Sequence, residues 1–462
     1  MRESDKSQTL APATGWRKWL RRFAWSMAIL VPALVLLRVI AGYVMEARFE
    51  SMIAELTRRG EPLSLADMAP PDLPPARNAA TYYELAFQHF ESLGEQDLTA
   101  FKKLTARTGA LSDEDIRKAM ALLDDAQPAM SMLLKATECE ECRYPIDYQS
   151  PGHLLRLPHL QKLRVLVYLL KLSSETNLER GYGGAAAENC ANALQVEQSL
   201  EQDPTPVSLL VESGLMGLTL AQLERVMDRA EPSESQLRQI ERLLRTEADR
   251  RRFTRVLSGE RCTGLSLIEL TLHDPNKLLE FVLGRRPGPV LRGLVRAGVF
   301  LYKPVILMDA CRYLEIMDRF IWLSKSPYAA SWDGWRSLNE EIEGIAGGGY
   351  IRHPMLQMLA PSLRKVAAVY DSSIAWKGCS RIAVALRLYR MENRRYPDKL
   401  EALVPRFIGE LPIDPFSGRS FIYQTEGKGF IVTSIGPNRK TDESKAGAAE
   451  SERDDIVWRC SR

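Results

Sequence analysis

Oxygen-bearing side chains collect in one short stretch near the C-terminus of the 462-residue chain. The segment from residue 435 to residue 455 contains Asn438, Thr441, Asp442, Asp454 and Asp455. Calcium binds about six to eight oxygen ligands from carboxylates, amides and backbone carbonyls. The segment therefore has the chemistry of a calcium loop. Its small and charged residues are also typical of a solvated acidic surface loop, which is the alternative.

Two cysteines in the middle of the chain have the spacing of a redox or metal pair. Cys139 and Cys142 are followed by His153 and His159, close to but outside the usual spacing of a zinc finger. A thioredoxin-like pair follows a strand, whereas this pair follows a helical pattern of apolar residues over 130–136. A zinc site, a local disulfide and two unlinked thiols all stay open. The apolar context of His159 also suits a core or capping histidine.

Motifs of the common enzyme classes do not occur in the sequence. The five histidines form no HExxH, and there is no G-x-S-x-G elbow and no phosphate-binding glycine loop. Cys262, in SGERC, suits a small buried residue. We therefore expect a protein that is not an enzyme, without catalytic or cofactor-binding residues. An uncharacterised enzyme or ligand-binding protein with its site in the helical region is the alternative.

The charge balance of the chain argues against the class of nucleic-acid-binding proteins. Lys and Arg number 62 against 59 Asp and Glu, a net charge of +3, so we expect no binding to nucleic acid, which requires a basic excess. The seven cysteines are odd in number and irregularly spaced, which argues against a disulfide framework.

One apolar segment stands out in the sequence. Residues 23–45 contain a single charge, Arg38, and as a helix they would span about 35 Å, enough to cross a bilayer. Basic residues dominate residues 1–22, so the positive-inside rule places the N-terminus in the cytoplasm. We predict a single-pass anchor with most of the chain on the extracytoplasmic side. A cleaved signal peptide ending at Val39-Ile40-Ala41 is the alternative.

Beyond this segment the sequence predicts a mainly α protein with a small C-terminal α+β unit. A polar helical stalk is expected to residue 67, followed by a proline-rich connector. Apolar residues at helical spacing then recur without a fixed period, which favours an irregular bundle over a repeat array. Two helix starts are predicted at Ser112 and Ser233, each followed at the third residue by a capping partner.

The final hundred residues combine a long helix with short strands. Helical spacing extends from residue 354 to residue 393, and alternation predicts a hairpin from 420–425 and 429–434 and a third strand at 455–458. The predicted regions are a basic cytoplasmic tail (1–22), a transmembrane helix (23–45), a stalk and connector (46–78), a helical domain (79–353) and the α+β domain (354–462).

Four motifs follow one another along the chain in this last domain. They are RIAVALRLYRMENRRYPDKLEALVP (381–405), LPIDPFSGRSFIY (411–423), FIVTSIGPNRK (430–440) and DDIVW (454–458). In order and spacing they resemble the C-terminal part of the G-type major pseudopilin of type II secretion. The resemblance covers less than a fifth of the chain. It implies a long helix, a small antiparallel sheet and a calcium-binding loop.

The resemblance also implies ligand positions and a role. The carbonyl of Ile435 and the side chains of Asn438 and Asp455 occupy ligand-like positions, and Asp442 and Asp454 are further candidates. Two departures concern this loop, because the family's loop aspartate is Asn438 here and a carboxylate position is Arg453. The membrane segment also lacks the family's peptidase site.

With this resemblance, we expect a protein anchored in a bacterial inner membrane, with its bulk in the periplasm and a structural or assembly role. Its expected partners are the membrane, through residues 23–45, and envelope or secretion-system proteins, and calcium is its expected ion.

Overall fold

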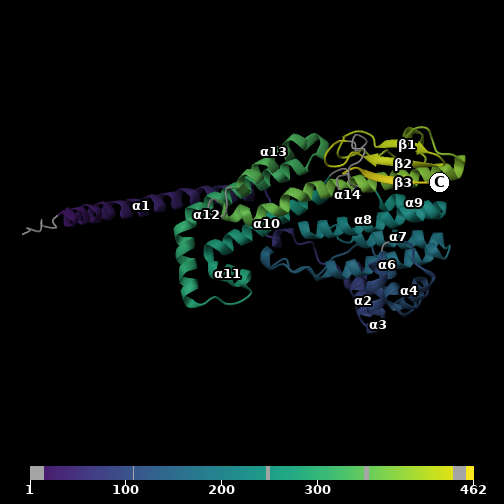
Figure 1. The fold of residues 1–462 in the computed structure, drawn as a ribbon, viewed down its shortest axis with the longest axis horizontal. Coiled ribbons are helices and arrows are strands. Elements are labelled where there is room, and N and C mark those ends of the chain that lie inside the picture. Colours follow the sequence, from purple (N-terminus) through teal and green to yellow (C-terminus); the bar gives the residue numbers. More distant parts are fainter. Residues whose placement is uncertain (1–14, 108, 246–249, 348–352, 441–453, 462) are drawn as a thin grey trace, which may run out of the picture.

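The computed structural model describes residues 15–107, 109–245, 250–347, 353–440 and 454–461. It is mainly helical with a three-stranded antiparallel sheet near the C-terminus, as Figure 1 shows, so the predicted mainly α fold with a small C-terminal sheet is confirmed. Apart from short 3-10 turns, the elements are α1 (Gly15–Arg58), α2 (Ala79–Glu91), α3 (Glu95–Thr105), α4 (Asp113–Asp125), α5 (Gln127–Thr137), α6 (Pro158–Glu179), α7 (Gly183–Gln198), α8 (Pro206–Arg229), α9 (Glu234–Leu243), α10 (Arg251–His273), α11 (Pro275–Leu283), α12 (Pro289–Ser324), α13 (Tyr328–Gly347), α14 (Pro354–Asn393), β1 (Ile422–Glu426), β2 (Gly429–Ser434) and β3 (Ile456–Cys460).

The first helix contains the apolar segment and continues beyond it into the body of the protein. The most apolar stretch of α1 is only 6% buried, which suits a helix that crosses a membrane. Helix α8 is also long and apolar enough, but its corresponding stretch is 56% buried, as in a core helix. The expected helical stalk to residue 67 is wrong beyond Arg58, because Gly60 adopts a left-handed conformation (φ +69°) and the chain continues in turns.

The helical body is a stack of layers. Figure 1 shows α2, α3 and α4 on one side, then α6, α7 and α8, and then α14 beneath the sheet. Both predicted helix starts are confirmed, since Ser112 and Ser233 form capping boxes with Asp115 and Gln236. The caps fix where α4 and α9 begin and satisfy backbone N–H groups that a helix end would leave unpaired.

The small sheet packs on the second half of α14. Its order is β1-β2-β3, all antiparallel, so the predicted hairpin and third strand are confirmed. Trp458 and Phe430 are fully buried against this helix within a hydrophobic core that also includes residues of α8, α9 and α12. A Cβ on Gly378 would lie 2.5 Å from the ring of Phe421, so only a glycine lets α14 approach so closely. The predicted C-terminal region and the helical region therefore share one core.

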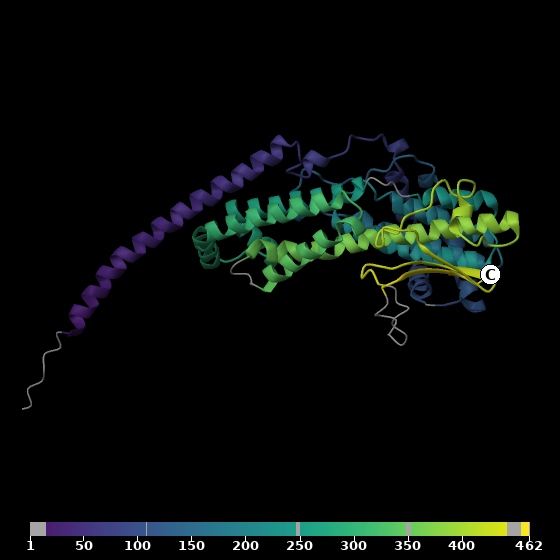
Figure 2. The same ribbon diagram turned by 90° about the horizontal axis from the view of Figure 1, so that it is seen from above.

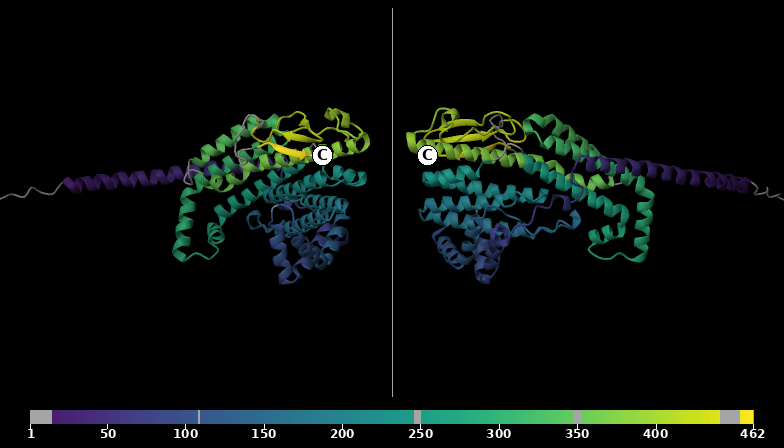
Figure 3. Two further views of the ribbon diagram at one scale, coloured as in Figure 1. Left: turned by 45° about the vertical axis from the view of Figure 1, so that its right-hand side comes forward. Right: turned by 180° about the vertical axis from the view of Figure 1, so that it is seen from behind.

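Helix α12 has two parts with different surroundings. Pro304 lies inside the helix, and all the buried residues of α12 come after it. The part before Pro304 projects from the body beside α11 (Figures 1 and 3). It runs across the direction of α1 in Figure 1 and is seen end-on in Figure 2.

Candidate functional site

The predicted metal residues lie where β2 leaves the sheet and β3 enters it. Ser434 pairs with Ile456 across these strands, so the two ends of the loop lie side by side. Gly436 turns the chain with φ +65°, and a Cβ on it would lie 1.9 Å from the carbonyl oxygen of Asp454. The residues that the structure brings together here are Ile435, Asn438, Asp454 and Asp455.

The side chain of Asn438 closes this loop through hydrogen bonds of its own. Its Nδ2 donates to Oδ2 of Asp454 at 3.0 Å, and its Oδ1 accepts from the backbone N–H of Lys440 at 2.7 Å. Asp442 lies outside the described residues. Within the described part of the chain, no group of three or more His, Cys, Asp or Glu side chains could hold a metal ion. Calcium also binds amide and backbone oxygens, which such a group does not include.

A buried carboxylate supports the loop from the neighbouring turn. Asp414 is 1% exposed and accepts a hydrogen bond from Oγ of Ser434 at 2.7 Å. It also accepts from the backbone N–H groups of Phe416 and Ser417 at 3.2 and 3.3 Å. Asp414 thus caps backbone N–H groups of its own turn. Its acceptor capacity is used within the fold, so its role is structural.

The cysteine pair consists of two unlinked thiols, one of the three alternatives that the sequence left open. Burial raises the pKa of Cys142 to about 12 and also raises the pKa of Cys139. Zinc binding and thiol exchange both need the thiolate, which these shifts disfavour at neutral pH.

His159 forms a buried pair with a carboxylate that sequence reasoning missed. Its Nε2 lies 2.7 Å from Oδ2 of Asp203, and that oxygen also accepts from Oγ of Ser208 at 2.9 Å. The ring of Tyr144 stacks on the imidazole, with centroids 4.2 Å apart. Histidine and aspartate are 44 positions apart on different segments, and no spacing rule links them. Only the apolar context of His159 predicted its burial.

A cavity of about 670 Å³ adjoins this pair. The proline-rich connector, the segment after Cys142 and the facing sides of α2 and α6 surround it. Lys162 and Glu84 pair at 2.7 Å on its wall. Its polar and aromatic lining comprises Asp72, Asn78, Thr81, Tyr83, Glu84, Arg143, Tyr144, Tyr148, His159 and Lys162. Converging polar and aromatic groups around a hollow are typical of small-molecule sites.

The cavity beside His159 and Asp203 is better suited to binding a ligand than to nucleophilic catalysis on it. Asp203 orients the imidazole of His159, which leaves the other ring nitrogen able to exchange one hydrogen bond with a ligand. Among the described residues, no serine, threonine or cysteine side chain hydrogen-bonds to that nitrogen. Tyr144 covers one face of the ring.

Comparisons with known proteins add no family to these observations. No family model, no curated protein and no solved structure matches the chain. The resemblance of residues 381–458 to G-type pseudopilins therefore stays a prediction, and the function has to be argued from the geometry.

Proposed function

We propose that the protein is a membrane-anchored assembly protein of the bacterial envelope. In this proposal α1 crosses the inner membrane with its N-terminus in the cytoplasm, and the body lies on the periplasmic side. The pseudopilin-like C-terminal module contacts partner proteins of the envelope or of a secretion system. Two features of the structure support this role.

The first feature is the firm attachment of the anchor to the body. Lys303 of α12 pairs with Glu46 of α1 at 2.7 Å, and Arg48 of α1 pairs with Glu315 of α12 at 2.7 Å. The same helix that would cross the membrane thus continues alongside α12 without a hinge. A rigid link of this kind would hold the body at a fixed place relative to the membrane, as an assembly component requires.

The second feature carries the proposal, and it is the open edge of the sheet. The outer edge of β3 is closed, because the backbone N–H groups of Arg459 and Ser461 donate to carboxylates of Glu224 and Asp228 on α8, each at 2.7 Å. The outer edge of β1 is solvent-exposed, and in the described residues no backbone hydrogen bond pairs it. An open edge strand is a ready surface for a partner strand.

Purification of the full chain from membranes tests this role. We expect envelope or secretion-system proteins to co-purify with the wild-type chain and to be lost from Ile422→Lys, which places a charge on β1. Val457→Lys on β3 is the matched control, since both side chains are 36% exposed. Recovery of no envelope protein would overturn the assembly role, and equal recovery from both variants would overturn contact through β1.

Binding of a small molecule in the cavity beside His159 is the second candidate function. The observation that favours it is the buried His159–Asp203 pair at the wall of a 670 Å³ hollow. Native mass spectrometry of the detergent-released chain should then show a bound mass that Thr81→Trp removes by filling the cavity. Thr99→Trp, on the exposed side of α3, should retain it. A chain without added mass in both wild type and control would count against the ligand.

Calcium binding at the C-terminal loop is a further part of the proposal, and it requires ligands from residues 441–453. Thermal unfolding of the full chain with calcium and with a chelator tests it. We expect calcium to raise the melting temperature of the wild type and to have less effect on Asp454→Asn. Equal melting temperatures with calcium and with chelator would overturn the proposal that the loop binds calcium.

A further inference from the structure

The largest cluster of exposed apolar side chains outside α1 lies on α11 and the first part of α12. Monomeric soluble proteins rarely expose so large a contiguous apolar surface. These side chains are between 43 and 76% exposed in the described structure. They are Phe281, Val282, Leu283, Val290, Leu291, Leu294, Phe300, Leu301 and Tyr302. We name residues 275–303, which carry them, the arm.

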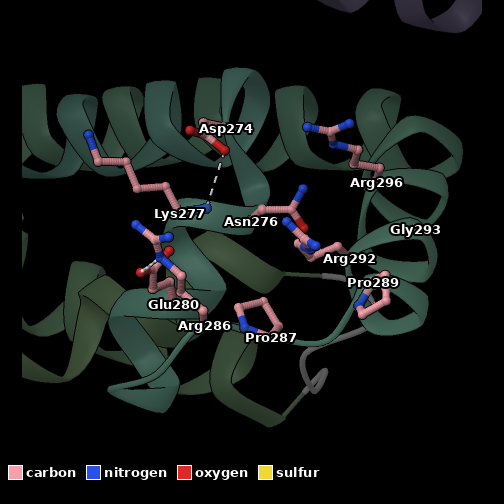
Figure 4. A pocket seen from close by; sticks show the side chains of 10 residues that line it. All are labelled: Asp274, Asn276, Lys277, Glu280, Arg286, Pro287, Pro289, Arg292, Gly293 and Arg296. Carbon is pink, nitrogen blue, oxygen red and sulfur yellow. Dashed lines mark hydrogen bonds and ion pairs between the residues drawn. The ribbon is translucent and has the colours of Figure 1, made fainter.

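The part of the arm that belongs to α12 is amphipathic, and its apolar face points away from the body. Val290, Leu294 and Leu301 recur at helical spacing on one face, and Arg292 and Arg296 lie on the opposite face. Figure 4 shows both arginines on the side of α12 that faces α11, where they line a hollow between the two helices. Since α11 lies on the body side of α12, the apolar face is turned outward (Figure 1).

The arm meets α1 at the end of the uncharged part of the membrane segment. The guanidinium of Arg38 lies 4.0 Å from the ring centroid of Phe300 and donates to the backbone carbonyl of the same residue. Residues 23–37 between Arg22 and Arg38 carry no charge and rise about 22 Å as a helix. Snorkelling of the two arginines extends this length toward the thickness of a hydrocarbon core. The arm therefore crosses α1 at the level of one membrane interface when the span ends at Arg38, which shortens the predicted span of residues 23–45 by its last seven residues.

The orientation of the arm fits the plane of a membrane. Figures 1 and 2 show it across the direction of α1, so it would lie along the surface of a bilayer that α1 crosses. An interfacial helix buries its apolar face roughly 5–10 Å into the boundary between headgroups and acyl chains. The outward apolar face is on the side toward which the lipid-facing part of α1 extends.

The charge of the arm is complementary to an anionic lipid surface. The arm contains six basic side chains and one acidic side chain, a net charge of +5, whereas the whole chain has +3. The acidic side chain, Glu280, pairs with Arg286 at 3.2 Å. Asp274, which precedes the arm, also lines the hollow between α11 and α12, together with Lys277 and Arg292. Basic side chains next to an interfacial apolar face are attracted to anionic headgroups.

We propose that the arm is a second membrane contact, an interfacial anchor for anionic phospholipid. It rests on the proposed crossing of the membrane by α1. The outward face of the arm is continuous with the apolar surface of α1 through the contact between Arg38 and Phe300, so lipid is the occupant that both surfaces share. Together, the crossing helix and the flat arm hold the body in one orientation on the membrane.

Photo-crosslinking of the full chain in vesicles tests the proposal. The vesicles contain phosphatidylcholine and phosphatidylglycerol, and p-benzoylphenylalanine replaces Leu34 in α1, Leu294 in the arm or Tyr182 in the body. These three side chains are 54, 65 and 56% exposed, so exposure is matched. We expect lipid adducts at Leu34 and Leu294 and none at Tyr182, as measured by mass spectrometry.

The outcomes separate this inference from the proposed function. Lipid adducts at Leu34 without lipid adducts at Leu294 would overturn the contact of the arm with lipid. The membrane crossing of α1 would stay in place. A protein adduct at Leu294, with a second copy or another chain, would also overturn it. No lipid adduct at Leu34 would overturn the membrane crossing on which the arm rests.

The preference for anionic lipid is tested by removing charge. Arg292→Gln with Arg296→Gln should lower the lipid adduct at Leu294 by about fivefold or more in these vesicles. Lys102→Gln with Lys103→Gln, which removes two exposed charges from α3, should leave it unchanged. An equal adduct yield in the arm variant and the α3 variant would overturn the anionic preference.

Discussion

The arm and the layer formed by α8 and α14 contain the same kinds of residues in opposite surroundings. Leu223 of α8 and Leu386 of α14 are fully buried, whereas Leu294 of the arm is 65% exposed. Arg381 of α14 is buried and pairs with Glu241 at 2.9 Å. The arginines of the arm line an open hollow instead.

The proposed interfacial anchor would account for this difference by placing the two regions in different solvents. In a water-excluded core, each buried charge has to be paired, and each apolar side chain stabilises the fold by leaving water. Leucine side chains exposed on a helix gain no such stabilisation in water, whereas at a membrane interface they enter the acyl region while arginines on the opposite face stay at the headgroups. The predictions below test whether the two regions respond to substitution as this comparison requires.

The largest effect is expected from the buried ion pair between α10 and α14. The guanidinium of Arg250 binds both carboxylate oxygens of Asp371 at 2.6 and 3.0 Å, and Asp371 is fully buried. Asp371→Ala leaves the arginine charge unpaired in the core, which should lower the free energy of unfolding by about 3–5 kcal/mol. Urea unfolding of the full chain in detergent, followed by circular dichroism, measures it.

An exposed pair provides the control for that loss. Asp333 on α13 pairs with Arg336 at 3.4 Å, and its side chain is 88% exposed. Asp333→Ala should change the free energy of unfolding by less than about 0.5 kcal/mol. Losses of similar size in the two variants would show that burial of the Arg250–Asp371 pair does not govern stability.

A buried acid in the core should make stability depend on pH. Burial raises the pKa of Glu197 from 4.5 to about 8, and Oγ1 of Thr219 donates to its carboxylate. The folded state then keeps a proton that the unfolded state loses, so stability falls as pH rises from about 4.5 to about 8. The shift corresponds to a total loss of about 3–5 kcal/mol over that range.

Substitution of Glu197 by glutamine should abolish this contribution. Glu197→Gln should therefore gain stability relative to the wild type between pH 5 and pH 8, as measured by urea unfolding at both pH values. Glu234→Gln is the control, because that side chain is 66% exposed on α9. If wild type and Glu197→Gln lost stability in parallel over this range, the carboxyl would not be protonated in the core.

Much of the body could be predicted from the sequence because its signals are local. The capping residues at Ser112 and Ser233 and the alternation in β1 and β2 depend on neighbours within a few positions. The buried pairs could not be predicted in this way. Arg250 and Asp371 are separated by 121 positions, and only the packing of α10 against α14 brings them together.

The arm was missed for a different reason. Arg292, Arg296 and Lys303 interrupt the apolar residues of α12, so the sequence has the pattern of an ordinary surface helix. An amphipathic pattern predicts that one face is covered but does not say by what. Of the predicted loop residues, Asn438 and Asp454 are joined by a hydrogen bond, and their role as metal ligands stays a prediction. Side-chain orientation, such as the hydrogen bond from Asn438 to Asp454, has no sequence signal.

A smaller effect is expected at the C-terminal loop, which like the arm lies at the surface but uses polar contacts. Asn438→Ala removes the hydrogen bonds to Asp454 and from Lys440, which should cost about 0.5–1.5 kcal/mol. Thermal unfolding in the presence of chelator isolates this contribution from any ion. Asn393→Ala is a control, because its single hydrogen bond lies at the exposed end of α14. A loss well above this range would mean that Asn438 supports more of the fold than the loop.

The smallest effect is expected in the arm, and it separates the two parts of one helix. Leu294 and Leu314 both belong to α12, but Leu314 is 1% exposed. Leu314→Ala should cost about 2–5 kcal/mol through the cavity it leaves. Leu294→Ala should change the free energy of unfolding in detergent by less than about 0.5 kcal/mol, because it leaves no cavity in the protein. Urea unfolding of the two variants side by side measures both values. A cost above about 1 kcal/mol at Leu294 would mean that the apolar face packs on the protein itself, and the arm would then have no face left for lipid.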